Sequence, residues 1–340
     1  MNNKKVSPEK ILDMNWAFAK TSVLAAGVEL DVFTHIAGGK KTVNQISKAT
    51  KSSRRAMEML LNALAGLGLL AKDKGGLFSL RPESGKFLVR GKPRYLGDMS
   101  LHSLELNKIW LHLAECVRSG KPYAAVDEKE GAEDYFPILV RGLFQMNYPC
   151  AKYAAAYLKK SHNRISDILD VAAGSGVWGI AIAEAFKTAK ITALDFPEVL
   201  KVTREYVNRF NLKDRYKYIK GNLRRINFGK ERYGLIILGH ICHSEGKIYT
   251  QQLLKKSFRA LKKGGVLLIA EFLLDNDKAG PLMPLLFALN MLVNTNEGDV
   301  FRAVKLKRWL HGAGFKAVKI LDKAPSVSPL ILAVKSWTTT

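Results

Sequence analysis

Residues 168–179, ILDVAAGSGVWG, bring together an apolar strand, a carboxylate and three glycines. Gly174, Gly176 and Gly179 have the G-x-G-x-x-G spacing of a nucleotide-binding loop. Glycine lets the chain turn sharply out of a strand and lets a ligand come close to the backbone. The spacing fits a nicotinamide dinucleotide, but it also fits other ligands that contain adenosine. The neighbouring residues must decide between them.

Two carboxylates argue against a pyrophosphate. Asp170 stands at the end of the strand, where it would attract an ammonium group and repel a phosphate. Asp195, in ITALDFPEVL, follows one strand-helix-strand step later and can accept hydrogen bonds from both hydroxyls of a ribose. S-adenosylmethionine contains adenosine, a sulfonium and an amino-acid end but no phosphate. We therefore expect S-adenosylmethionine as the cofactor.

The first part of the chain has the pattern of helices followed by a hairpin. Residues 11–37, 42–50 and 53–70 have apolar residues at helical spacing, and two short strand-like pieces surround Gly75 and Gly76. This order predicts a winged-helix-like, mostly helical domain over residues 1–98.

The rest of the chain predicts an α/β domain. Residues 99–160 look helical and form a predicted connector that contributes to the substrate pocket. From residue 161 to 340, strand-like runs alternate with helical runs, which predicts a parallel, Rossmann-like sheet covered by helices on both faces. The last two strand-like runs, 315–323 and 328–337, should pair antiparallel at the edge of that sheet.

Composition indicates a folded, cytoplasmic protein. Apolar residues make up 47 % of the chain, but the apolar stretch at 281–293 is too short to span a bilayer and contains two prolines. Cys116, Cys150 and Cys242 are widely spaced, so we expect no disulfide framework and no metal site.

The net charge of +24 allows contact with an acidic substrate or an anionic surface. It also raises the possibility of a winged-helix regulator that binds DNA. The candidate recognition helix at 52–66 is mostly apolar, however, and suits burial better than a DNA groove. We therefore expect no nucleic-acid partner.

Five motifs in order resemble a known family: LDVAAGSGVWG, LDFPEV, GNLRR, LGHICHSEG and LKKGGVLLIAE. The chain resembles the S-adenosylmethionine-dependent O-methyltransferases of the plant caffeate and acetylserotonin type and their bacterial relatives. The resemblance implies a class I methyltransferase fold and an N-terminal domain that makes a homodimer.

The resemblance also assigns residues to the cofactor. The amino-acid end would lie against the first glycines and Asp170, the ribose against Asp195, and the adenine against the residues that follow Asp195 and the next strand. The implied cofactor residues are Asp170, Gly174, Gly176, Asp195, Phe196, Asn222 and Leu223.

His243 falls at the position of the family's catalytic histidine. An imidazole titrates near neutral pH and can take the proton from a substrate hydroxyl. The resemblance implies that Glu271, 28 residues later, accepts from His243 and sets its tautomer. Ser244 and Val300 depart from acidic residues of the family. His240 aligns with a family tryptophan, and we expect it to pack.

The family closes its substrate pocket with helices on either side of the core domain. By resemblance the pocket-lining residues are Phe144, Met146, Asn147, Leu286, Asn290, Met291 and Thr295. Their apolar surroundings suit a large planar or lipophilic acceptor.

These observations predict methyl transfer to a hydroxyl of a small aromatic or lipophilic metabolite, with His243 as general base. Two alternatives remain open. One is a C-, N- or S-methyltransferase of the same fold that works mainly by proximity. The other is a winged-helix regulator or a family member that binds the cofactor without transferring its methyl group.

Overall fold

The computed structural model describes residues 6–125, 132–162, 164–277, 279–321, 324–326 and 328–336. The chain divides into two compact units, Met1–Lys108 and Ile109–Thr340. The predicted domain limits at residues 98 and 160 remain predictions.

The first unit is helical with one short hairpin. Its helices bury one apolar core that includes Phe33, Leu61 and Phe78. Thr42 and Gln45 form a capping box at the start of one helix, since each side chain accepts from the other's backbone N–H. The elements are α1 (Glu9–Asn15), α2 (Ala17–Glu29), α3 (Val32–Ala37), α4 (Val43–Ala49), α5 (Arg54–Gly66), β1 (Leu70–Lys72), β2 (Phe78–Leu80) and α6 (Pro82–Phe87), followed by α7 (Gly97–Trp110), which crosses the unit boundary.

The predicted hairpin around Gly75 and Gly76 is present, because β1 and β2 pair antiparallel. The long helical run predicted at 11–37 is divided into three helices. Asp31, which precedes α3, has a φ of 53°, a left-handed conformation that no helix continues through.

The second unit contains a seven-stranded sheet in the order β10-β11-β7-β6-β3-β4-β5. The strands β3 to β7 run parallel to one another, whereas β11 pairs antiparallel with β7, and β10 pairs antiparallel with β11. The strands are β3 (Asp167–Val171), β4 (Lys190–Asp195), β5 (Tyr216–Lys220), β6 (Tyr233–Gly239), β7 (Leu261–Ala270), β10 (Ala317–Leu321) and β11 (Leu330–Val334). The predicted antiparallel pair at the sheet edge is thus confirmed.

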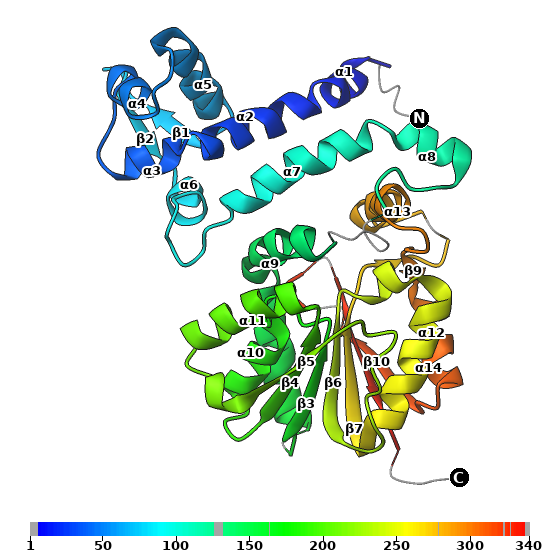
Figure 1. Ribbon diagram of the computed structural model, residues 1–340. Helices are drawn as coiled ribbons and strands as arrows, with labels where there is room; N and C mark the ends of the chain where they lie inside the picture. The colour runs from blue at the N-terminus through cyan, green and yellow to red at the C-terminus, as the bar shows by residue number, and fades with distance from the viewer. Residues whose placement is uncertain are drawn as a thin grey trace. The chain divides into compact units, whose positions relative to one another are not determined.

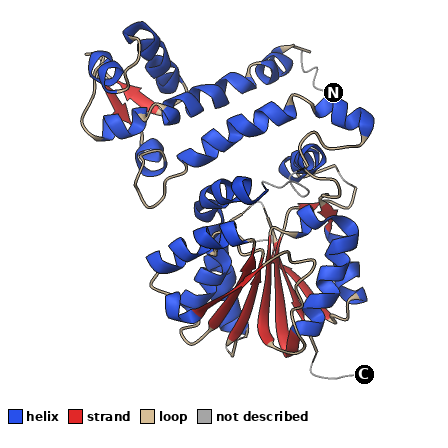
Figure 2. Cartoon of the chain, in the orientation of Figure 1, coloured by secondary structure: helices blue, strands red, loops and turns tan. Residues whose placement is uncertain are grey.

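Helices cover both faces of this sheet, as Figures 1 and 2 show. Alternate residues of one strand face opposite cores: Ile168 packs into one apolar cluster and Leu169 into the other. The first cluster lies under α9 (Ala132–Ser161), α10 (Val177–Ala185) and α11 (Pro197–Arg209). The second lies under α12 (Cys242–Ala260) and α14 (Ala303–Gly312).

The remaining elements precede α9, connect α11 to β5 or follow β7 along the chain. They are α8 (Leu113–Ser119), a 3-10 turn (Lys213–Arg215), the short parallel pair β8 (Leu273–Leu274) and β9 (Phe301–Arg302), and α13 (Leu282–Asn294). The backbone N–H groups of Tyr123 and Ala124 both donate to the Val293 carbonyl, which ties the segment after α8 to α13. Among the described helices, we find none with both the length and the apolar character that a bilayer span needs.

Gly246 kinks α12 within its first turns. Its φ of 63° and ψ of −171° are non-helical, and a Cβ there would lie 2.1 Å from the Glu297 carbonyl oxygen. The kink lets the loop at 295–299 approach the start of α12, where the Asp299 N–H donates to the His243 carbonyl. A glycine is therefore needed to bring these two segments together.

We predict that Gly246→Ala lowers the free energy of unfolding by about 2 kcal/mol, because the added methyl group meets backbone and the φ is left-handed. The matched control is Gly312→Ala at the end of α14, where an added Cβ meets nothing within 4 Å. The control should change stability by less than about 1 kcal/mol. Urea unfolding measures both variants, and equal midpoints would contradict the prediction.

Candidate active site

The glycine loop joins β3 to α10 at the carboxyl edge of the parallel strands. Gly174 and Gly176 have φ values of 58° and 76°, which side chains other than glycine rarely adopt. Gly176 is the N-cap of α10, and a Cβ there would lie 2.9 Å from Thr203 Cγ2. The loop can therefore form this tight turn only with glycine at these positions.

Asp195 ends β4, the neighbour of β3. Its Oδ2 accepts from the Gly174 N–H at 2.8 Å, and its Oδ1 accepts from the Phe196 N–H at 2.7 Å. Burial raises the pKa of this carboxyl to about 6, although the two amide hydrogen bonds oppose the shift. Both oxygens are thus fixed beside the loop, with further lone pairs for ribose hydroxyls.

Asp170 lies under the start of α10 and is 1 % exposed. Its Oδ2 accepts from the Gly179 N–H at 2.9 Å, while Oδ1 has no partner among the described residues. Burial is the main cause that raises the pKa of this carboxyl to about 8. A buried carboxylate oxygen without a donor, next to a glycine turn, fits a ligand with a cationic group.

The adenine residues predicted from sequence lie on the adjacent strands. Phe196 follows Asp195 and is partly buried, and Asn222 and Leu223 follow β5, the neighbour of β4. Asn222 is exposed, and its Oδ1 accepts from the Arg224 N–H at 2.8 Å. The Lys256 ammonium donates to the Leu223 carbonyl at 2.6 Å and so holds this loop against α12. These residues and Asp195 share one edge of the sheet, as the cofactor assignment requires.

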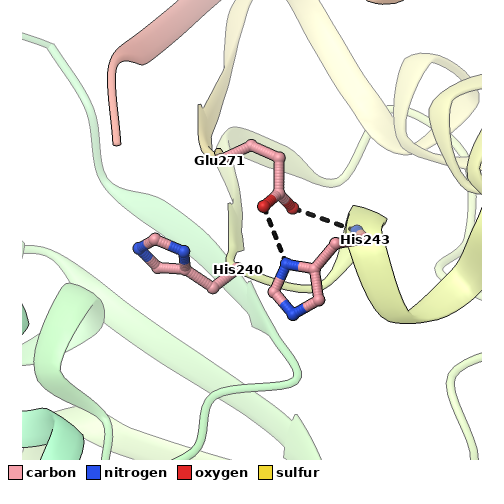
Figure 3. A group of neighbouring side chains, drawn as sticks. All are labelled: His240, His243 and Glu271. Carbon is pink, nitrogen blue, oxygen red and sulfur yellow. Dashed lines mark hydrogen bonds and ion pairs between the residues drawn. The ribbon is translucent and has the colours of Figure 1, made fainter. Parts of the chain in front are cut away.

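His243 and Glu271 form a close, buried pair (Figure 3). His243 Nδ1 lies 2.7 Å from Glu271 Oε1, and the His243 backbone N–H donates to Oε2 at 3.1 Å. The Phe272 N–H donates to Oε1 at 2.9 Å. Because β6 and β7 are parallel neighbours, the residues that follow them meet at the same edge. That geometry joins two residues 28 positions apart.

The electrostatics of the pair assign its tautomer. Burial alone would raise the pKa of Glu271, but His243 and the amide donors hold it below its usual value. An ionised carboxylate only accepts hydrogen bonds, so Nδ1 of His243 carries the proton. In the neutral ring, Nε2 then carries the lone pair, which is what a general base needs.

His240, Glu271 and His243 also have donor atoms within 4.8 Å of one another, close enough to consider a metal ion. Both oxygens of Glu271 already accept hydrogen bonds, one from Nδ1 of His243. A metal would have to displace these contacts. The arrangement therefore describes a hydrogen-bonded acid–base pair better than a metal centre.

Two features of the site were not predicted from the sequence. The Phe287 and His243 rings meet in a T-shaped arrangement with centroids 4.8 Å apart, and Phe272 packs on Phe287 with centroids 4.4 Å apart. Arg224 Nε donates to Glu245 at 2.8 Å, which links the loop after β5 to the first turn of α12. Phe272 follows Glu271 directly, which is a signal in the sequence, but the other contacts depend on tertiary packing.

The predicted substrate residues differ in how far they are buried. Phe144 is 1 % exposed and stacks on Tyr206 in the core, with ring centroids 4.2 Å apart, a placement that does not support substrate contact. On α9, Met146 is exposed and Asn147 is partly buried. On and after α13, Leu286 is exposed, whereas Met291 and Thr295 are buried. The Asn290 amide oxygen accepts from Trp110 Nε1 at 3.1 Å.

Comparison with known proteins identifies the family. Residues 110–316 match the O-methyltransferase domain, and residues 12–90 match the O-methyltransferase dimerisation domain. The chain belongs to the O-methyltransferase family. Its members use S-adenosylmethionine, so the predicted family, α/β fold class, enzyme class and cofactor are confirmed.

Individual relatives agree over almost the full length. The chain is 26 % identical to the tetracenomycin polyketide synthesis 8-O-methyltransferase of Streptomyces glaucescens, covering 92 % of each chain. It is 26 % identical to the 3-hydroxy-5-methyl-1-naphthoate 3-O-methyltransferase of Streptomyces sahachiroi, covering 97 % of this chain and 96 % of the relative. It superposes on the human N-acetylserotonin methyltransferase, solved with S-adenosylmethionine, with a TM-score of 0.85 at 25 % identity, covering 99 % and 100 %.

The raised pKa of Asp195 predicts a pH dependence of cofactor binding. The carboxyl keeps its proton up to about pH 6 and must lose it before both oxygens can accept ribose hydroxyls. Affinity for S-adenosylhomocysteine should therefore rise as the pH increases from about 5 to about 7. Isothermal titration calorimetry across that range measures the effect.

The Asp195→Asn variant should bind S-adenosylhomocysteine more weakly than the wild type. Its affinity should also no longer rise between about pH 5 and about pH 7. The matched control is Asp167→Asn, whose carboxylate pairs with Lys262 at the start of β3 and should keep the rise. An unchanged pH slope in Asp195→Asn would contradict the assignment of Asp195.

Proposed function

We propose that the enzyme methylates a hydroxyl oxygen of a small aromatic acceptor, with His243 as the general base. The observation that carries the proposal is the 2.7 Å contact between His243 Nδ1 and the buried carboxylate of Glu271. The contact fixes the ring and leaves Nε2 free at the carboxyl edge of the sheet, beside the strands that bear the glycine loop and Asp195.

The chemistry follows from these positions. The cofactor, when bound, supplies a methyl group activated on a positively charged sulfur. His243 Nε2 accepts the proton of the acceptor hydroxyl, which makes the oxygen a stronger nucleophile. The resulting imidazolium is stabilised by the Glu271 carboxylate, which stays ionised. Asp195, Asp170 and the glycine loop orient the cofactor, and proximity supplies most of the remaining rate.

An aromatic acceptor agrees with the surroundings of the base. Phe272 and Phe287 pack beside His243, and their faces suit a planar ring. We also propose that the acceptor contacts the predicted pocket residues Met146, Asn147, Leu286, Asn290, Met291 and Thr295. Phe144 supports the core that carries α9. The named activities of the two Streptomyces relatives, on a polyketide and a naphthoate, support the same class of acceptor.

We also propose a homodimer made by the N-terminal unit. The match of residues 12–90 to the dimerisation domain supports it. Large apolar side chains on α1 and the start of α2 are more than half exposed, namely Ile11, Leu12, Met14, Trp16 and Phe18. Such a patch is typical of a surface that another subunit covers.

A cytoplasmic location completes the proposal. All three cysteines, Cys116, Cys150 and Cys242, are free and buried. Reduced cysteines agree with a reducing compartment.

His243→Ala should reduce kcat by about a hundred- to ten-thousand-fold, the usual contribution of a general base. Affinity for S-adenosylhomocysteine should stay within a few-fold of the wild type, since His243 is assigned to the acceptor proton. Product formation by mass spectrometry and cofactor titration by calorimetry measure the two effects separately.

The control is His311→Ala, a histidine on α14 whose Nδ1 faces the Phe315 carbonyl at 2.9 Å. It should keep the wild-type rate. Full activity in His243→Ala would show that proximity alone suffices and would remove the base from the mechanism.

A further inference from the structure

His240 is held in an unusual backbone conformation at the end of β6. Its φ is 59°, in the left-handed region that histidine rarely adopts. Its backbone N–H donates to the Ala270 carbonyl at 2.9 Å, which fixes the residue between the ends of β6 and β7. Strained backbone that is retained at the edge of an active site points to a functional requirement.

The imidazole of His240 lies between the glycine-loop helix and the base. Its ring centroid is 6.2 Å from Trp178 on α10, 5.4 Å from Phe272 and 6.3 Å from His243. Figure 3 shows it across the Glu271 carboxylate from His243. The sequence predicts that His240 packs against its neighbours. The structure adds that one of these neighbours is His243, the proposed base.

Neither ring nitrogen of His240 has a hydrogen-bond partner within the described parts of the chain. The neighbouring charged and titratable groups are Glu271 and His243, and Glu271 already accepts three hydrogen bonds. Burial lowers the pKa of His240 to about 4, so the ring is neutral. A neutral imidazole offers one donor and one acceptor, and in this partly buried position both stay available to a ligand.

We propose that His240 hydrogen-bonds a second oxygen of the acceptor, adjacent to the hydroxyl that is methylated. The acceptor class is then an aromatic compound with two neighbouring oxygens, either on adjacent ring carbons or in a peri arrangement. This inference rests on the proposed O-methylation with His243 as base.

The spacing agrees with such a pair of oxygens. A ring nitrogen of His240 lies within 4.8 Å of one of His243. Neighbouring oxygens on an aromatic ring are about one hydrogen-bond length apart, roughly 2.7 Å. The two imidazole rings, with centroids 6.3 Å apart, are close enough for one ligand with two neighbouring oxygens to reach both. An acceptor with a single hydroxyl would shield the His240 ring from water without offering it a hydrogen bond. Such an acceptor should therefore react with a lower kcat/KM.

Matched naphthols test the proposal with the full-length enzyme and S-adenosylmethionine. The first pair is 2-naphthol and 2,3-dihydroxynaphthalene, and the second is 1-naphthol and 1,8-dihydroxynaphthalene. Mass spectrometry gives kcat/KM for each compound. We expect the wild type to prefer the dihydroxy member of at least one pair by about 10-fold or more per reactive hydroxyl.

Two variants separate hydrogen bonding from packing. His240→Leu keeps an apolar side chain but removes both nitrogens, and we expect the preference to fall to about 1 while the rate on the single-hydroxyl compound stays within a few-fold of wild type. His240→Asn tolerates the left-handed φ and keeps hydrogen-bonding groups, so it should restore part of the preference. Calorimetry with S-adenosylhomocysteine checks that each variant retains its cofactor site.

The outcomes are distinct. Equal efficiency on both members of each pair in the wild type, or an unchanged preference in His240→Leu, overturns the role of His240 and leaves O-methylation intact. Loss of S-adenosylhomocysteine binding in His240→Leu also overturns it, because the residue would then serve the cofactor. Transfer to none of the four compounds counts against both this inference and the proposed acceptor class.

Discussion

The active site depends on one buried carboxylate. Glu271 is fully buried and accepts from the His243 ring, the His243 backbone and the Phe272 backbone. Burying the Glu271 carboxylate without these three donors would cost much free energy. Without the carboxylate, in turn, the three N–H groups would lose their acceptor. The same three hydrogen bonds therefore stabilise the charge, join the end of β7 to the start of α12, and orient the base.

The parallel sheet brings the rest of the site to this carboxylate. In β3, β4 and β6 the carboxyl ends meet at one edge, so the glycine loop, Asp195 and His240 follow their strands into the same region. Contacts between the loops, and between a loop and α12, then hold the edge together. Gly174 donates to Asp195, Lys256 reaches the Leu223 carbonyl, and Arg224 pairs with Glu245 two residues after the base. Cofactor loops and base are thus positioned by the same set of contacts.

Much of this arrangement could be predicted from the sequence because it follows from local rules. Glycines at 174 and 176 require a turn, and an acidic residue at 195 comes one strand later. The alternation of strands and helices places both at one edge. The motif resemblance brought His243 and Glu271 into the prediction, and the parallel pairing of β6 with β7 explains physically why they meet.

Other features depend on packing, which periodicity does not reveal. Phe144 belongs to a helix whose apolar residues can face a pocket or a core, and its stacking on Tyr206 is a contact that the sequence does not reveal. The T-shaped contact between Phe287 and His243 joins α13 to α12, and the Arg224–Glu245 pair joins the loop after β5 to the first turn of α12. His240 aligns with a packing position of the family, and the proposal of a polar role depends on its ring nitrogens, which have no hydrogen-bond partner among the described residues. Such contacts arise from the tertiary fold rather than from spacing along the chain.

We infer that Glu271 holds the His243 ring with its proton on Nδ1 and its lone pair on Nε2. Nitrogen-15 NMR of the imidazole at neutral pH, with His243 assigned by substitution, measures the protonation of each ring nitrogen directly. We expect a protonated Nδ1 and an unprotonated Nε2 in the wild type. A proton on Nε2 with a bare Nδ1, or rapid exchange between both tautomers, would contradict it.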